Sequence, residues 1–321
     1  MPKIVKADAA NIRKAASIIR DGGVVAFPTE TVYGLGCDTF NERAALDVYR
    51  IKRRPSSNPL IAHVLDVQMA KRVAIGWDVR CQRLAEAFWP GPLTLVLPRR
   101  AEVAPSSIGG RSTVAVRSPS HPVARQLIEA VGSPISAPSA NRSGRISPTK
   151  AEHVELELAD EPDLMILEGG TCTVGLESTV LDLSRSRPMV LRPGSVTKDM
   201  LMSVIGDVAE PLFVGQSGSP GTHLRHYAPR TRAEIVDTSG IDHRLMSCPE
   251  PVAVLAFSAD VVPPPHVAII MPSDPREYAM KLYDALRHAD SLDRSLILIE
   301  RPKDKTGIWE AIQDRLRRAA V

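Results

Sequence analysis

The sequence predicts an α/β protein with two modules, and three observations support this fold class. Apolar runs of strand length alternate with amphipathic helical patterns along the chain. In the first part, several strands are separated by links of hairpin length, which favours a twisted mixed sheet flanked by helices over a regular doubly wound sheet. Beyond a Gly-, Ser- and Pro-rich stretch, strands and helices alternate regularly, as in a small Rossmann-like α/β module.

The first module begins with a helix that Asp8 caps and Gly22-Gly23 ends. A second helix starts at Asn41 and ends before Pro55, because proline disfavours helical backbone in the residue before it. We expect residues 29–36 to form a loop between them. The expected helices are 8–21, 41–54, 67–74, 78–88, 121–132 and one starting at Thr149. The expected strands are 24–28, 60–65, 93–98, 113–117, 164–167, 178–183 and 189–192.

Residues 206–232 show little periodicity and are rich in Gly, Ser and Pro, so we interpret them as a linker. The end of this linker, HLRHYAP, carries two histidines, an arginine and a tyrosine, none of which flexibility requires. The chain therefore divides into a module at 1–205, the linker, and a module at 233–321. In the second module we expect strands at 233–238, 251–258, 267–272 and 295–300, and helices at 275–290 and 307–321.

Composition excludes several classes of protein. The 321 residues are 44% hydrophobic and 24% charged, as in ordinary soluble globular proteins. A net charge of +3 gives no global field for nucleic acid, and 4% aromatic residues disfavour binding of single strands by base stacking. The N-terminus does not resemble a signal peptide, and no apolar run reaches the roughly 20 residues of a membrane span. The cysteines lack the spacing of a disulfide framework or a zinc motif, and they are Cys37, Cys81, Cys172 and Cys248. We therefore expect a cytoplasmic protein.

The best-known nucleotide and metal motifs are missing from the sequence. Neither GxxxxGK[ST] nor GxGxxG occurs, and there is no HEXXH or EF-hand pattern. The spacing of His223 and His226 could fit a metal, but no third ligand stands nearby in the sequence. We therefore predict no protein-bound metal site.

Four stretches carry polar residues that packing alone does not require. FPTETVYGLG places hydroxyls and a carboxylate after a strand, and ISAPSANRSG offers small residues and hydroxyls suited to a phosphate or sugar. VAVRSPSHPVA and MVLRPGS put Arg117 and Arg192 at strand ends, where a charge is costly unless an anion meets it. Each stretch alone is explained equally well by strand caps and turns. Together they predict a site for a polyphosphate and a small carboxylate.

A set of motifs in one order makes the sequence similar to the YrdC-like threonylcarbamoyl-AMP synthase family. These motifs are FPTETVYGLG, KRRPSSNPLIAHV, FWPGPLTLVLP, VAVRSPSHPVA, APSANRSG and VGLESTVLDL…LRPGS. The linker segment SPGTHLRHYAPR and the α/β module after it resemble the long, two-domain form of that family. The resemblance implies a twisted sheet around a concave, positively lined cavity, which the linker covers.

The resemblance also implies an activity. Members of the family convert L-threonine, bicarbonate or CO2, and ATP into L-threonylcarbamoyl-AMP, pyrophosphate and water. Mg²⁺ arrives with ATP, because the sequence shows no conspicuous carboxylate cluster for it. The adenylate serves a separate transferase that modifies the adenosine next to the tRNA anticodon. Whether tRNA also contacts this chain weakly stays open at this stage.

The resemblance also implies site residues, because each quoted motif contains positions that contact substrate in the family. The positions that match threonine contacts are Thr31, His63 and Ser178, with Arg117 at the position that binds the threonine carboxylate. The positions that match ATP contacts are Arg54, Asn58, Thr113, Ser139, Arg192 and Tyr227, with Lys52 beside them. We expect Lys52, Arg54 and His63 to be catalytic, although His63 could be a base or only position the substrate.

Departures from the family pattern are modest. Relatives often have Gly and Asp where this chain has Arg53 and Ser57, which makes the loop more positive, and we expect Arg53 to be plain surface. Some members have Thr at Ala137, so we leave this position out of the site.

The main alternative is a non-enzymatic module that binds double-stranded RNA through its phosphates. The low net charge and the threonine-type residues disfavour it. The fold also occurs in hydrogenase-maturation proteins, but those carry zinc-finger and acylphosphatase-like segments that this sequence lacks.

Overall fold

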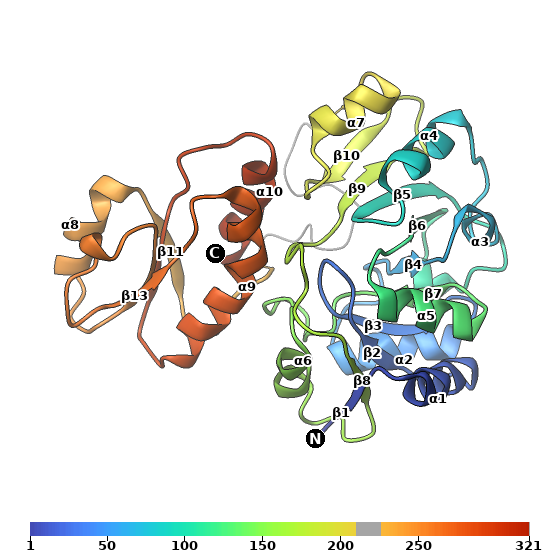
Figure 1. Ribbon diagram of the computed structural model, residues 1–321, viewed down its shortest axis with the longest axis horizontal. Coiled ribbons are helices and arrows are strands. Elements are labelled where there is room, and N and C mark those ends of the chain that lie inside the picture. The colour runs from blue at the N-terminus through green and yellow to red at the C-terminus, as the bar shows by residue number, and fades with distance from the viewer. Residues whose placement is uncertain (210–225, 321) are drawn as a thin grey trace.

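The computed structural model describes residues 1–209 and 226–320, in which two separate sheets each carry their own helices (Figure 1). The larger sheet is formed by the first part of the chain and the smaller one by the last part. Of the linker predicted at 206–232, residues 210–225 lie outside the described residues, and so does His223. The fold is thus α/β with one large mixed sheet and one small parallel sheet, as the sequence predicts.

The larger sheet has ten strands in the order β1-β8-β2-β3-β7-β4-β6-β5-β9-β10, with parallel and antiparallel neighbours. In chain order the strands are β1 (Lys3–Lys6), β2 (Val25–Phe27), β3 (Gly34–Asp38), β4 (Ile61–His63), β5 (Leu93–Pro98), β6 (Thr113–Arg117), β7 (Ile135–Ala137), β8 (Met165–Glu168), β9 (Thr179–Asp182) and β10 (Met189–Arg192).

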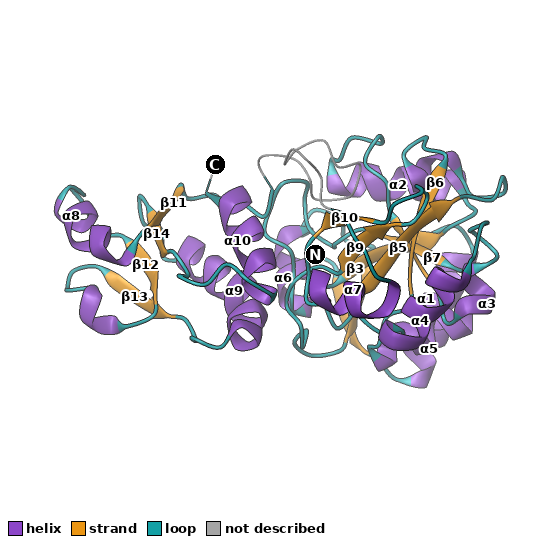
Figure 2. Cartoon of the chain, turned by 90° about the horizontal axis from the view of Figure 1, so that it is seen from above, coloured by secondary structure: helices purple, strands orange, loops and turns teal. Residues whose placement is uncertain are grey.

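Helices cover both faces of this sheet (Figure 2). Helices α1 (Ala9–Arg20) and α5 (Pro122–Val131) pack together on one face, and α2 (Glu42–Lys52) and α6 (Ala151–Glu157) pack on the other. The same strands supply both cores, because successive side chains of a strand point to opposite faces. The remaining helices of this part are α3 (Val67–Ala70), α4 (Val79–Phe88), α7 (Lys198–Ile205) and the 3-10 turn η1 (Pro105–Ile108).

Strand β3 (Gly34–Asp38) corrects the end of the loop expected at 29–36, whose residues 34–36 belong to the strand. It is a buried strand of sequence GLGCD, whose glycines carry no β-propensity signal. A Cβ at Gly36 would lie 2.6 Å from Cε1 of Phe27, and one at Gly34 would lie 3.3 Å from Cζ of the same ring. These glycines therefore allow the Phe27 ring to lie against the next strand. This requirement for glycine comes from packing between strands and cannot be predicted from the local sequence pattern.

Among the described residues, two further strands and two α-helices are missing from the sequence prediction. β1 is a short edge strand with a lysine at each end, a composition that reads as surface. β7 has only three residues, inside a run of small and polar ones. Helix α7 follows a Pro-Gly turn, and the smaller module has a six-residue helix, α8 (Ile241–Met246). Short elements such as these are stabilised by tertiary contacts more than by propensity.

The smaller sheet has four parallel strands in the order β11-β14-β12-β13. In chain order the strands are β11 (Ala233–Val236), β12 (Ala253–Ala256), β13 (Val267–Ile270) and β14 (Ile297–Glu300). Helices α9 (Pro275–Ser291) and α10 (Ile308–Ala319) pack on one face, and α8 packs on the other. None of the helices that the structure describes combines the length and the apolar composition that crossing a membrane requires.

Helices α9 and α10 lie between the small sheet and the first module (Figure 1). Their apolar core extends across the boundary to Val32, Ile146 and Leu176. On α9, Asp284 accepts a hydrogen bond from Lys150 Nζ at 2.8 Å, and Arg287 donates one to the carbonyl oxygen of Ile146. The interface therefore has an apolar centre with charged contacts around it.

Candidate functional site

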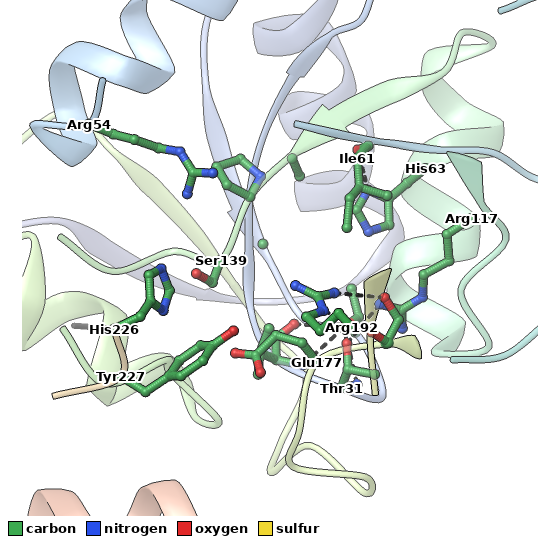
Figure 3. A pocket seen from close by; sticks show the side chains of 16 residues that line it. Thr31, Arg54, Ile61, His63, Arg117, Ser139, Glu177, Arg192, His226 and Tyr227 are labelled. Atoms are coloured by element: carbon green, nitrogen blue, oxygen red, sulfur yellow. Dashed lines mark hydrogen bonds between the residues drawn. The ribbon is translucent and has the colours of Figure 1, made fainter. Parts of the chain in front are cut away.

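A cavity of about 40 Å³ opens on the face of the large sheet where several strands end (Figure 3). The register of the strands brings polar side chains to this cavity, because His63 on β4 pairs with Arg117 on the parallel strand β6. The two side chains therefore point to the same face. The lining residues are Thr29, Thr31, Val32, Gly34, Arg54, Ile61, His63, Arg117, Ala137, Pro138, Ser139, Glu177, Ser178, Arg192, His226 and Tyr227.

Most of the residues that the resemblance implies line this cavity, although they come from segments far apart in the sequence. They are Thr31, Arg54, His63, Arg117, Ser139, Ser178, Arg192 and Tyr227. Lys52, Asn58 and Thr113 are not among the lining residues. Asn58 lies in the turn after α2, where its carbonyl oxygen accepts from the Tyr49 hydroxyl at 2.7 Å, and Thr113 is the first residue of β6.

Lys52 holds a loop instead of facing the cavity. Its side chain is buried, and Nζ donates to the carbonyl oxygens of Ser139 and Asn141. Burial, together with the positive charge of Arg54, holds the pKa of Lys52 well below its usual value. The catalytic role expected of Lys52 stays a prediction, and its side chain does not line the cavity. In the structure Lys52 positions the loop that presents Ser139.

Arg54 reaches the cavity because α2 ends in a tight turn. Arg53 adopts a left-handed conformation with φ 49°, which is unfavourable for a residue with a Cβ. The Arg53 side chain is 73% exposed and pairs with Asp160 at 2.9 Å, so it lies on the surface. Arg54, by contrast, is only 8% exposed.

No carboxylate among the described residues pairs with Arg54. Its Nη2 has one weak contact, at 3.5 Å to the carbonyl oxygen of Pro59, and its Nε has no partner there. Burial lowers the pKa of Arg54 to about 10, which still leaves it charged at neutral pH. A buried cation in this state is costly unless an anion binds to it.

His226 and Tyr227 form the cavity wall near Arg54 (Figure 3). Tyr227 has φ 62°, and its ring stacks on Tyr283 of α9 at 5.7 Å between centroids. The Nδ1 atom of His226 and the hydroxyl of Tyr227 are buried without a partner in the described part of the chain. Buried polar groups are normally hydrogen-bonded. The unpartnered atoms of His226, Tyr227 and Arg54 therefore favour a polar, anionic ligand at this end of the cavity.

The opposite end of the cavity contains Arg117, Thr31 and His63 (Figure 3). Arg117 Nη1 donates to the Thr31 hydroxyl at 2.8 Å, and Nη2 lies 2.6 Å from Glu30 Oε1. Burial alone would raise the pKa of Glu30, but the charge of Arg117 outweighs it and lowers that pKa. The pair is therefore ionised, and Glu30 fixes the guanidinium in place.

His63 is neutral in this environment. Its Nδ1 lies 3.0 Å from the carbonyl oxygen of Ile61, which can only accept, so Nδ1 carries the proton and Nε2 has the lone pair. Burial and the positive charge of Arg117 lower the pKa of His63 to about 4. His63 is thus a hydrogen-bond acceptor at neutral pH and a weak base.

Ser178 and Arg192 form the floor between the two ends. Arg192 donates through Nε to the carbonyl oxygen of Ser178 at 3.0 Å and through Nη2 to the Ser178 hydroxyl at 3.1 Å. The same hydroxyl lies 2.7 Å from Oγ1 of Thr94. These bonds keep the arginine against β9, and burial lowers its pKa.

Glu177 is a carboxylate in the cavity wall that connects the two modules. Its Oε1 accepts from the Ser147 hydroxyl at 2.6 Å, and its Oε2 accepts from Tyr283 at 2.8 Å and from Arg315 Nε at 3.0 Å. Arg315 lies on α10, and its side chain is fully buried. Burial would raise the pKa of Glu177, but the charges of Arg315 and Arg192 lower it. The second module therefore compensates a negative charge in the cavity wall.

Sequence reasoning missed Glu30, Glu177 and His226 as site residues. Each stands in a polar motif, FPTETVYGLG, VGLESTVLDL or HLRHYAP, so a local signal was present. The two carboxylates pair with arginines that lie far away in the sequence. Their partners, Arg117 and Arg315, stand 87 and 138 residues away.

Comparisons with known proteins agree with this geometry. Residues 17–194 match a family profile described as "Telomere recombination", which covers Sua5, YciO and YrdC proteins. Residues 196–321 match a second profile, the C-terminal domain of threonylcarbamoyl-AMP synthase. The chain is 40% identical to threonylcarbamoyl-AMP synthase of Pyrococcus abyssi, with 96% of this chain and 94% of the relative covered. It is 39% identical to the Bacillus subtilis protein of the same name, with 96% and 92% covered.

Two solved structures of Pyrococcus abyssi Sua5 resemble the whole chain. A complex with L-threonine superposes with a TM-score of 0.89 at 36% identity, covering 100% of this chain and 97% of the other. A variant in which a histidine and the tyrosine after it are alanine superposes with a TM-score of 0.91 at 34% identity, covering 100% and 96%. In the present chain a histidine precedes a tyrosine only at 226–227, in the cavity wall.

Proposed function

The chain belongs to the threonylcarbamoyl-AMP synthase family, in its two-domain form, and from this we propose that it makes L-threonylcarbamoyl-AMP from L-threonine, bicarbonate and ATP. Pyrophosphate and water are the other products. Because an adenylyl group is transferred, the enzyme acts as a nucleotidyltransferase. The observation that carries this proposal is the cavity with two chemically different ends.

The end with Arg117 suits a small amino acid. A guanidinium has five N–H groups, and those of Arg117 contact Gly91, Thr31 and Glu30, which leaves two for a carboxylate. The neutral His63 offers Nε2 as an acceptor for an amine or hydroxyl. A relative's complex with L-threonine supports threonine as this ligand. His63 then positions the amine, because a group whose pKa is about 4 is a poor base for it.

The end with Arg54 suits the triphosphate of ATP. Arg54 has no carboxylate partner in the described residues, and His226 and Tyr227 offer unpartnered polar atoms beside it. Ser139 lies on the loop that Lys52 holds, and Arg192 lies on the floor toward the threonine end. Binding energy from these groups would place the α-phosphate between the two ends.

The reaction then needs two bond-forming steps. The threonine nitrogen attacks the carbon of CO2, which bicarbonate supplies with loss of water, and the ammonium protons pass to solvent, leaving a carbamate. A carbamate oxygen attacks the α-phosphorus, and the bond to the leaving pyrophosphate breaks. Charge builds on phosphate oxygens during this step, so Arg54 and Arg192 stabilise it electrostatically.

We propose that Mg²⁺ enters as part of the ATP complex. Glu177 is the one carboxylate in the described cavity lining, and Ser147, Tyr283 and Arg315 already occupy its oxygens. That donor set does not resemble a protein-built Mg²⁺ site, so phosphate oxygens and waters would supply the ligands. The product would be passed to a separate tRNA threonylcarbamoyl transferase.

The decisive experiment is mass spectrometry of the protein mixed with ATP, threonine and bicarbonate. We expect an ion with the mass of threonylcarbamoyl-AMP, together with pyrophosphate, and both should disappear when any one substrate is omitted. Pyrophosphate release that does not depend on threonine would contradict the proposed function.

The alternative of a double-stranded RNA-binding module is less well supported. The arginines that line the cavity are buried and closed in by His226 and Tyr227, whereas duplex RNA is bound on an open surface. RNA binding without threonine-dependent pyrophosphate release would favour this alternative.

We predict that the KM for threonine stays flat between pH 5.5 and 8. An ordinary histidine titrates near pH 6.5, but the pKa of His63 is lowered to about 4, so its Nε2 stays unprotonated across this range.

Replacing His63 by alanine should raise the KM for threonine about tenfold, the order of one lost hydrogen bond. His63→Asn keeps an acceptor and should recover most of the loss. An inflection in KM near pH 6.5 that vanishes in His63→Asn would contradict a neutral His63.

A further inference from the structure

A second cavity, of about 410 Å³, opens at one edge of the small sheet, and we call it the crevice. It shares no lining residue with the cavity described above. The residues that line it are Thr238, Phe257, Ser273, Glu300, Pro302, Lys303, Asp304 and Trp309. Nothing in the proposed reaction uses this crevice.

The position of the crevice follows from the topology of the sheet. All four strands are parallel, so their carboxyl ends meet at one edge. Thr238 follows β11, Phe257 follows β12, Ser273 follows β13, and Glu300 ends β14. The chain leaves β11 toward α8 on one face and leaves β14 toward α10 on the other face. Where neighbouring connections diverge in this way, open α/β sheets form their ligand crevices.

Glu300 supplies hydrogen-bond acceptors in the lining of the crevice. It is 5% exposed, at the end of the central strand β14. Its Oε1 accepts from the Thr238 hydroxyl and its Oε2 from the backbone N–H of Phe257, each at 2.7 Å. These bonds fix the carboxylate in place. Each oxygen keeps a further lone pair, so Glu300 can accept two hydroxyl groups of a ligand.

Aromatic rings and charge narrow the class of ligand further. Phe257 and Trp309 contact each other with centroids 6.4 Å apart, and both line the crevice. Such a wall favours a planar ring system. Glu300 and Asp304 outnumber the single lining cation, Lys303, so a polyphosphate would meet net negative charge. A sugar alone would leave the rings unused, and an anionic aromatic ligand would be repelled.

We propose that this crevice binds a neutral nucleoside, whose ribose hydroxyls donate to Glu300 and whose base lies against Phe257 and Trp309. The second module then has a ligand site of its own in addition to its contacts with the catalytic cavity. This inference does not depend on the proposed function, because it concerns residues that the synthase reaction does not touch.

Calorimetry with adenosine as the probe tests the proposal on the full-length protein. Saturating α,β-methylene-ATP and threonine fill the catalytic cavity, so any adenosine that binds must occupy another site. We expect one adenosine to bind per chain. AMP should bind at least tenfold more weakly, because its phosphate meets Glu300 and Asp304. Absence of adenosine binding, or equal binding of AMP, would overturn the proposal.

Two matched variants locate the site. Ser273 is exposed and lines the crevice, so Ser273→Trp should fill it and weaken adenosine binding at least tenfold. Ser239 is also exposed, in the 3-10 turn at Thr238–Gly240 after β11, but does not line the crevice, so Ser239→Trp should bind adenosine like the wild type. Synthase activity of both variants should be unchanged, which reports that each is folded. Undiminished adenosine binding by folded Ser273→Trp would place the nucleoside elsewhere and refute the assignment.

Discussion

Replacing Arg54 by alanine is expected to lower the rate of threonylcarbamoyl-AMP formation by about tenfold to a thousandfold, the usual cost of losing a charge-stabilising group. Arg54 is the buried cation of the cavity that no carboxylate in the described residues neutralises. Its removal leaves charge on the transferring phosphate without a fixed partner. Initial rates of pyrophosphate release at saturating and limiting ATP give the effects on kcat and KM separately.

Arg53 provides the matched control for this variant. It is the adjacent residue and carries the same charge, but its side chain is 73% exposed and pairs with Asp160 on the surface. Arg53→Ala should therefore keep nearly wild-type kinetics. If Arg54→Ala had full activity, the assignment of this end of the cavity to triphosphate would be wrong.

Replacing Arg315 by alanine is expected to lower the free energy of unfolding by about 3–5 kcal/mol, the typical cost of breaking a buried ion pair. The guanidinium is fully buried and donates to Glu177 at 3.0 Å, and it also lies 5.5 Å from the centroid of the Tyr227 ring. Without it, Glu177 and Asp314 would each lose a buried ion-pair partner, and the less compensated charge of Glu177 in the cavity wall would repel ATP. The KM for ATP should rise, and the denaturant midpoint of unfolding should fall.

The double variant Arg315→Ala with Glu177→Gln separates electrostatics from packing. Removing both charges should recover at least half of the lost stability and part of the increase in the KM for ATP. Arg317→Ala, on the exposed face of the same helix, should change neither quantity. A double variant as impaired as Arg315→Ala alone would show that the charge of Glu177 is not the cause.

Together these variants ask what the second module contributes to catalysis. It reaches the cavity through Arg315 and Tyr283, which hold Glu177 and pack against Tyr227. Its own crevice lies elsewhere, at the carboxyl edge of the small sheet. The module thus has one surface that completes the wall of the catalytic cavity and another that we assign to a separate ligand.

Local patterns predict the longer elements well and the shorter ones poorly. Helix α1 has a cap at Asp8 and an apolar stripe, so its prediction at 8–21 nearly matches Ala9–Arg20. β3 was not predicted because its glycines are required by the packing of Phe27, a residue on the paired strand, and not by local propensity. Propensity describes what a segment prefers in isolation, whereas β3 exists because of what packs against it.

The α/β class, the family and the strand-end motifs could be predicted from the sequence, because periodicity, turn residues and motif spacing are local properties of the chain. Which side chains meet depends on the tertiary fold. It directs Lys52 to the backbone at Ser139, pairs Arg117 with Glu30, and brings Arg315 from α10 to Glu177. A charged residue acts according to the charges and carbonyl groups within a few ångströms of it, and those distances are set by how distant segments pack.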